Sequence, residues 1–116
     1  MSMNHQAASD VGRAFAAALA ARDYAGAYAM TAREYQGTSS LEELRAAFEA
    51  IVPLDWGTVG PVDVVHTMDD WPDKQPLDVR WVYVSIGGDV YSEAVTVVVT
   101  LEDGSPKVRH VEFGRP

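Results

Sequence analysis

The sequence predicts an α+β fold in which N-terminal helices pack on an antiparallel sheet of about four long strands. Apolar residues at helical spacing are confined to the first half of the chain, and segments rich in valine, threonine and aromatic residues to the second half. Helices followed by a run of strands joined through turns are typical of α+β domains. With 116 residues the chain has the length of one domain, so residues 1–116 are expected to form a single unit.

The first predicted helix lies in "SDVGRAFAAALAARDYAGAYAM", with Ser9 or Asp10 as the expected N-cap. Residues 1–8 are expected to be a disordered tail. The apolar residues at helical spacing are Val11, Phe15, Ala18 and Leu19. Asp23 is the expected N-cap of a second helix, in which Gly26 lowers the helical propensity by about 1 kcal/mol relative to alanine.

The stretch "EYQGTSS" breaks the helical pattern, and "SSLEELRAAFEAIVP" begins another helix. A capping box is predicted at its start, either Ser40 with Glu43 or Ser39 with Glu42. Its apolar stripe consists of Leu41, Leu44, Phe48 and Ile51. Pro53 marks its end.

Four strands are predicted in the second half of the chain. Their sequences are "TVGPVDVVHT", "DVRWVYVSI", "DVYSEAVTVVVTL" and "KVRHVEFG". Turn-forming "GGD" separates the second from the third, and "EDGSP" separates the third from the fourth. Pro61 suits the start of an edge strand, where no ladder donor is needed.

Glu93 lies on the otherwise apolar side of the third strand. The length of each turn decides which residues of neighbouring strands lie opposite each other, and opposed residues point to the same face of the sheet. A two-residue turn after Ile86 would place Glu93 beside Arg80, whereas a three-residue loop would place it beside Trp81. We prefer the two-residue turn. Either even-length loop within "DGSP" would add His110 and Glu112 to the face that carries Glu93, together with Val97, Val99 and Val108. The opposite face would collect Trp81, Tyr83, Ala94, Thr96, Val98, Val111 and Phe113.

The stretch "FAAALAARDYAGAYAMTAREYQGTSSLEELRAAFEAI", followed by four long strands, resembles the NTF2-like superfamily (a cystatin-like α+β cone). Within it, "ARDYAGAYAMTAREYQGTSSLEELRAAF" is similar to the small NTF2-like domains associated with penicillin-binding transpeptidases. The resemblance implies helices wrapped by a curved sheet, a ligand cavity between the two, and a homodimer formed through the sheet face. This fold carries enzymes, carriers and immunity proteins alike, so it does not decide the function.

A helix–sheet cavity would be lined by Phe15, Leu19, Tyr28, Phe48, Arg80, Tyr91, Glu93, His110 and Glu112. We expect Arg80 and Glu93 to form an ion pair in it. Alternatively, Glu93 or His110 could transfer protons, as in the isomerase-like and dehydratase-like relatives of this fold. Trp71, in the loop "DDWPDK", is expected to anchor the loop on the domain or to cover a cavity mouth.

Nine basic and seventeen acidic residues give a net charge of −8, which argues against nucleic acid as a partner. An acidic surface would suit a basic protein partner. There is no cysteine, so thiol catalysis and thiolate zinc sites are excluded. Neither His66 with Asp69 and Asp70 nor any other group has a recognised metal-ligand spacing. No cofactor motif is present.

We expect no membrane span, because the apolar runs are short, and no signal peptide, so the expected location is the cytoplasm. The sequence therefore favours a small binding or interaction module that takes a small apolar ligand or a protein partner. The alternatives are an isomerase-like or dehydratase-like enzyme and an immunity-type protein that neutralises a partner.

Overall fold

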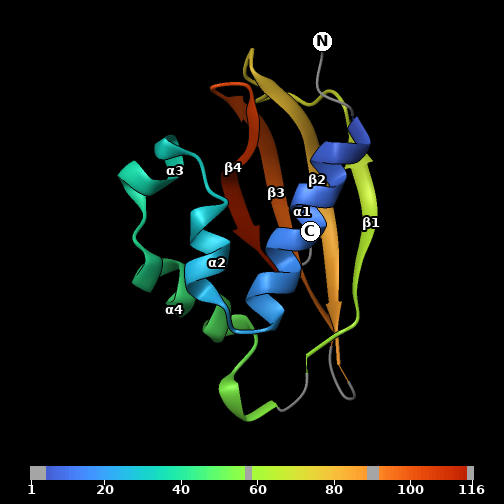
Figure 1. Ribbon diagram of the computed structural model, residues 1–116. Helices are drawn as coiled ribbons and strands as arrows, with labels where there is room; N and C mark the ends of the chain where they lie inside the picture. The colour runs from blue at the N-terminus through green and yellow to red at the C-terminus, as the bar shows by residue number, and fades with distance from the viewer. Residues whose placement is uncertain (1–4, 57–58, 89–91, 115–116) are drawn as a thin grey trace.

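A computed structural model describes residues 5–56, 59–88 and 92–114. In this part of the chain four α-helices precede four strands: α1 (His5–Ala20), α2 (Tyr24–Ala29), α3 (Arg33–Thr38), α4 (Leu41–Ile51), β1 (Val62–Met68), β2 (Asp78–Gly87), β3 (Ser92–Glu102) and β4 (Ser105–Phe113), with a short 3-10 helix, η1 (Leu54–Trp56), after α4. The strands form one antiparallel sheet in the order β1-β2-β3-β4 (Figure 1). The predicted α+β class is confirmed.

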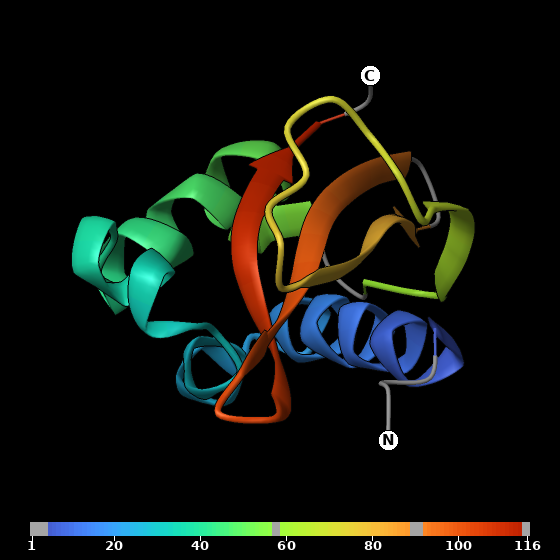
Figure 2. The ribbon, with the colours of Figure 1, turned by 90° about the horizontal axis from the view of Figure 1, so that it is seen from above.

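The helices lie on one side of the sheet and around its β4 edge (Figures 1 and 2). α1 runs across the sheet, while α2, α3 and α4 lie beside β4. The segment between α2 and α3 pairs with β4, because Ala32 donates to the Val108 carbonyl at 2.7 Å and Val108 donates to the Met30 carbonyl at 2.9 Å. The β4 edge is therefore partly covered by the chain's own backbone. No described helix is long and apolar enough to cross a membrane.

α1 begins earlier than we predicted. It starts at His5, so residues 5–8 are helical rather than part of a disordered tail. Ser9 is not an N-cap; it is buried within α1 and its hydroxyl accepts a hydrogen bond from Arg80 at 2.9 Å. Ser9 therefore binds Arg80 of the sheet instead of taking the capping role that the sequence predicts.

The predicted caps of α2 and α4 are confirmed. Asp23 accepts a hydrogen bond from the Gly26 backbone N–H at 3.0 Å. A Cβ atom at Gly26 would lie 2.3 Å from an Asp23 carboxylate oxygen, so this glycine leaves room for the cap. Ser40 and Glu43 form the capping box of α4, with bonds of 3.1 and 2.9 Å. The stretch that we expected to break the helical pattern overlaps a short helix, α3, which the sequence did not predict.

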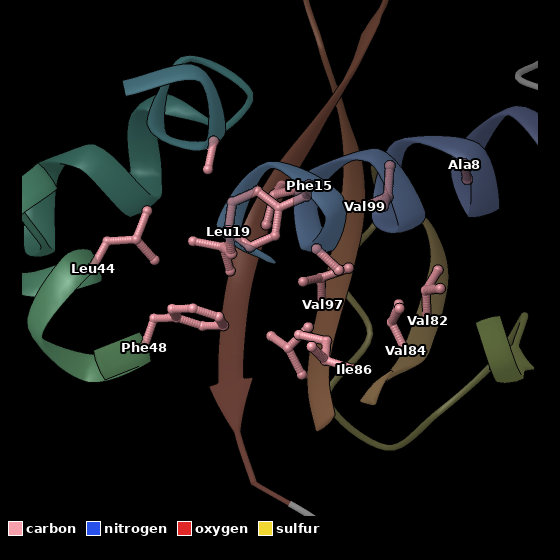
Figure 3. Packing of buried hydrophobic residues seen from close by; sticks show 14 of the residues in the cluster. Ala8, Phe15, Leu19, Leu44, Phe48, Val82, Val84, Ile86, Val97 and Val99 are labelled. Atoms are coloured by element: carbon pink, nitrogen blue, oxygen red, sulfur yellow. The ribbon is translucent and has the colours of Figure 1, made fainter. Parts of the chain in front are cut away.

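The hydrophobic core lies between the helices and the sheet face that α1 covers (Figure 3). Phe15 and Leu19 of α1 and Leu44 and Phe48 of α4 point toward the strand valines. The fully buried strand residues are Val82, Val84, Ile86, Val95, Val97, Val99 and Val108. α1 approaches β2 closely at Gly12, where a Cβ atom would lie 3.0 Å from Val82.

The predicted face of Glu93 is confirmed, but its predicted place beside Arg80 is wrong. Glu93 lies opposite Ile86 in the β2–β3 ladder, which places it on the face that carries Val82 and Val84. The residues of the turn itself, including Tyr91, lie outside the described part of the chain.

The predicted positions of His110 and Glu112 are wrong. β4 contains one extra residue, Arg109, between the pairs Val99–Val108 and Val98–His110. A bulge of one residue reverses the side-chain parity beyond it. His110 and Glu112 consequently lie on the face away from α1, which we call the outer face. Val111 and Phe113, which we expected there, lie on the core face and pack against the core.

Candidate functional site

A cavity of about 280 Å³ lies on the outer face of the sheet. The β1–β2 loop (residues 69–77, yellow in Figure 2) arches over the sheet on the side away from α1. The cavity is lined by three residues of this loop and by five strand residues. These are Trp71, Asp73, Gln75, Trp81, Val98, Arg109, His110 and Glu112.

The loop is held in place by Asp78, the first residue of β2. The Asp78 carboxylate accepts the Gln75 backbone N–H at 2.8 Å, and Asp78 donates its own N–H to the Gln75 carbonyl at 3.0 Å. Arg109 donates two hydrogen bonds to the same carboxylate, at 2.8 and 2.7 Å. The Asp78 side chain is 0% exposed. The bulge residue of β4 is therefore tied to the base of the loop by a buried bidentate ion pair.

The electrostatics of this pair favour the charged forms. Burial raises the pKa of the Asp78 carboxyl, but hydrogen bonds from Arg109, the Gln75 backbone and Thr100 outweigh burial and hold that pKa below its usual value. Arg109 has a second acidic neighbour, Glu34 of α3, at 3.6 Å. The guanidinium charge is thus satisfied within the protein.

A second tether fixes the other end of the loop. Arg80 donates to the Asp69 carboxylate at 2.8 Å and to the Ser9 hydroxyl at 2.9 Å. The hydrogen bond from Arg80 lowers the pKa of Asp69. The ion pair that we expected between Arg80 and Glu93 is absent: Glu93 lies opposite Ile86, six residues from Arg80 along β2, or about 20 Å.

Aromatic side chains form two walls of the cavity. Trp71 comes from the loop and Trp81 from β2. Trp81 is stacked on Tyr83, with ring centroids 6.2 Å apart and planes at 10°, and His66 meets its edge at 5.8 Å. The Lys74 ammonium lies 5.4 Å from the Trp71 ring centroid. Trp71 is half-buried and lines the cavity.

His110 and Glu112 form the polar wall. They are two residues apart on β4 and share the outer face, with His110 Nε2 3.0 Å from a Glu112 carboxylate oxygen. Both side chains are largely exposed, at 49% and 69%. Val98 of β3, only 3% exposed, lies between His110 and Trp81 in the ladder and forms the apolar floor.

The residues predicted for a helix–sheet cavity do not line a common cavity among the described residues. Phe15, Leu19 and Phe48 are fully buried in the packed core. The Tyr28 hydroxyl donates to the Ser39 carbonyl at 2.8 Å. None of these four lines either described cavity. Of the predicted residues that the structure describes, only His110 and Glu112 line the outer-face cavity, and they reach it through the bulge.

A second, more apolar hollow of about 290 Å³ adjoins the first. The two share Gln75 and Arg109. The other residues of this hollow are Ala32, Glu34, Pro76, Leu77, Thr100, Leu101 and Glu102. Among the described residues, no group of three or more histidine and acidic side chains is placed to hold a metal ion.

Sequence reasoning missed Asp73, Gln75 and Arg109 as neighbours of one cavity, and it did not connect Trp71 with His110 and Glu112. One signal for the bulge is present in "KVRHVEF", where the apolar residues Val108, Val111 and Phe113 are spaced by three and then by two. Residues three apart on a regular strand point to opposite faces of the sheet. Two apolar residues at that spacing can both face the core only if a bulge adds one residue between them. The path of a nine-residue loop over the sheet has no such signal.

Comparisons of the chain with protein-family models, with curated proteins and with solved structures gave no match.

Proposed function

We propose that this protein is a small binding module of the NTF2-like kind that holds a small organic molecule in the outer-face cavity. The element order supports the NTF2-like assignment, since helices precede a meander of long antiparallel strands. The site differs from the one that the resemblance implies, because it lies on the opposite face of the sheet from the helices.

The observation that carries this proposal is the combination of two tryptophans with a few polar groups around one hollow. Binding sites for small molecules are concave, with aromatic walls and a small number of polar side chains that orient the ligand. Trp71 and Trp81 supply the walls, and His110 and Glu112 supply polar side chains that are exposed to a ligand. Arg109 and Asp78 supply rigidity beneath the loop.

The three tryptophans of the chain provide a direct test. Trp71 and Trp81 line the cavity, whereas Trp56 lies in η1 and lines neither described hollow. In nitrogen-15 NMR spectra, a library of small organic molecules should contain members that shift the indole N–H signals of Trp71 and Trp81 and leave that of Trp56 in place. A library that shifts none of them, or all three equally, would reject the cavity as the binding site.

Proton-transfer catalysis is a second candidate, and the His110–Glu112 contact of 3.0 Å favours it. An imidazole and a carboxylate within hydrogen-bond reach can act as acid and base. Glu93 cannot join them, because it lies on the core face. If ligands found by NMR are chemically altered over time, replacing His110 by Gln should stop the conversion while binding remains.

The homodimer through the sheet face is a further part of the proposal. It is supported by the NTF2-like resemblance and by the half-buried Trp81–Tyr83 stack on the outer face. The chain mass is 12.6 kDa, and light scattering of the purified protein should return twice that value. If the molar mass measured at high protein concentration equals that of one chain, the proposed dimer is wrong.

A further inference from the structure

We propose that the outer-face cavity selects organic cations, such as alkylammonium groups, over neutral and anionic molecules of the same shape. This inference rests on the proposed binding function and adds the chemical class of the ligand. Charge and aromatic geometry support it independently.

The charges that line the cavity leave an excess of negative charge. Glu112 and Asp73 both line it, and Asp73 forms no ion pair with another described residue. The single arginine of the lining, Arg109, is neutralised by Asp78 at 2.7 Å and has Glu34 at 3.6 Å as a further acidic neighbour. An anionic ligand would therefore meet carboxylates and no free guanidinium, whereas a cation would meet the carboxylate of Asp73 and that of Glu112, which His110 Nε2 approaches at 3.0 Å.

The aromatic walls favour the same charge. The faces of indole rings carry negative potential and attract ammonium groups placed within about 6 Å of the ring centroid. The structure already shows one such contact, because the Lys74 ammonium lies 5.4 Å from the Trp71 centroid. Trp81 also lines the cavity, and its ring is stacked on Tyr83. A cation bound between the loop and the sheet would thus contact aromatic and carboxylate groups together.

The net charge of the whole chain acts in the same direction. At −8 it raises the local concentration of cations and lowers that of anions around the protein. This long-range effect is screened by salt, whereas contacts inside the cavity are screened less. A preference for cations that persists in 0.5 M NaCl therefore reports on the cavity itself.

The test uses three probes of one shape: choline, its neutral isostere 3,3-dimethylbutan-1-ol and the anion 3,3-dimethylbutanoate. Affinities are measured from the indole N–H signals of Trp71 and Trp81 in 0.5 M NaCl, with Trp56 as the internal reference. We expect choline to bind about five- to thirtyfold more tightly than the neutral alcohol, and the anion to bind more weakly than either.

Two variants locate the preference. Glu112→Gln should reduce the choline affinity about three- to tenfold and leave that of the neutral alcohol unchanged, since only a cation uses the carboxylate charge. Trp71→Ala should weaken both probes. Glu42→Gln on α4, which removes an exposed carboxylate remote from both described hollows, is the matched control and should change neither affinity.

The outcomes separate this inference from the proposed function. Equal affinities for choline and the neutral alcohol, or tighter binding of the anion, would overturn the cation preference and leave the cavity as a binding site. No binding of choline would also overturn it, while the proposed function would still be judged by the wider library of molecules. A choline preference that survives in Glu112→Gln and in Trp71→Ala would show that the selectivity arises elsewhere.

Discussion

Replacing Arg109 by methionine removes one partner of a buried ion pair and should be among the most damaging single changes on the sheet. Methionine keeps much of the side-chain length, so the main loss is the charge and the two hydrogen bonds to Asp78. The Asp78 side chain is 0% exposed and would keep only its bonds from the Gln75 backbone and Thr100. A buried charge left without its partner costs about 3–5 kcal/mol.

The reciprocal change should be milder. Asp78→Asn removes the charge but leaves an oxygen that can accept the Gln75 N–H, and Arg109 keeps Glu34 as an acidic neighbour. Losing the charge-assisted part of the pairing costs about 1–3 kcal/mol. The two single variants are therefore expected to differ, with Arg109→Met the less stable protein. The double variant should be more stable than the sum of the two losses predicts, because neither charge is then left alone.

Urea unfolding followed by circular dichroism measures these free energies of unfolding. An unchanged slope of the free energy against urea concentration would show that the unfolded state is the same in each variant. The control variant is Arg45→Met on α4, which removes an ion pair with Glu42 on the surface. This variant should leave the midpoint of the urea unfolding transition unchanged. The reasoning would be refuted if Arg109→Met cost less than about 1 kcal/mol, or if Asp78→Asn were the more damaging of the two.

Three other predictions concern the acid range, the close approach of α1 to the sheet and the cap of α4. Because the pKa of Asp78 is lowered in the folded state, its stabilising contribution is full above about pH 4 and is lost as the pH falls through the folded pKa; Asp78→Asn should flatten this part of the acid-unfolding curve. Gly12→Ala should destabilise the protein by about 1 kcal/mol despite the better helix former, because its Cβ would lie 3.0 Å from Val82; Gly37→Ala on α3, where nothing lies within 4 Å, should be neutral or stabilising in the same urea assay. Ser40→Ala should cost about 1 kcal/mol by thermal or urea unfolding, since it leaves the start of α4 without its side-chain acceptor; an unchanged midpoint would mean that the capping box does not stabilise the helix.

The elements that sequence reasoning located well are those whose signal is local. A capping residue such as Asp23 or Ser40 acts within three positions of itself, and both were found. Strands made of alternating valines have a period that no helix shares, so all four were found to within a few residues. α3 was missed because its six residues include Gly37 and Thr38 and present no apolar stripe. Its position is fixed by tertiary contacts near β4 rather than by propensity.

The candidate site was largely unpredictable for a different reason. It is built from a loop that lies over the sheet and from residues of three strands, β2, β3 and β4, so the contacts that join the loop to the strands are non-local. Arg80 illustrates the difficulty, because its true partners, Ser9 and Asp69, belong to α1 and to the loop. The expected partner, Glu93, shares its face but stands at the other end of the strand. The alternation of side chains along a strand predicts which face a residue points to, but it does not predict how far apart two residues on that face lie.

The bulge at Arg109 connects the fold to the candidate site. Without the extra residue, strict alternation from Val108 would turn Val111 and Phe113 outward and bring His110 and Glu112 against the core. That exchange would bury two polar side chains and expose two apolar ones, so the sequence after Val108 is compatible with the core only if one residue is left out of the ladder.

The residue left out is an arginine, and its side chain crosses the outer face to the buried carboxylate of Asp78 at the base of the loop. The same residue thus places His110 and Glu112 on the outer face and holds the loop that carries Trp71 above them. Loss of the Arg109 side chain should therefore weaken ligand binding at the cavity as well as folding, whereas loss of the Glu112 charge should affect binding alone.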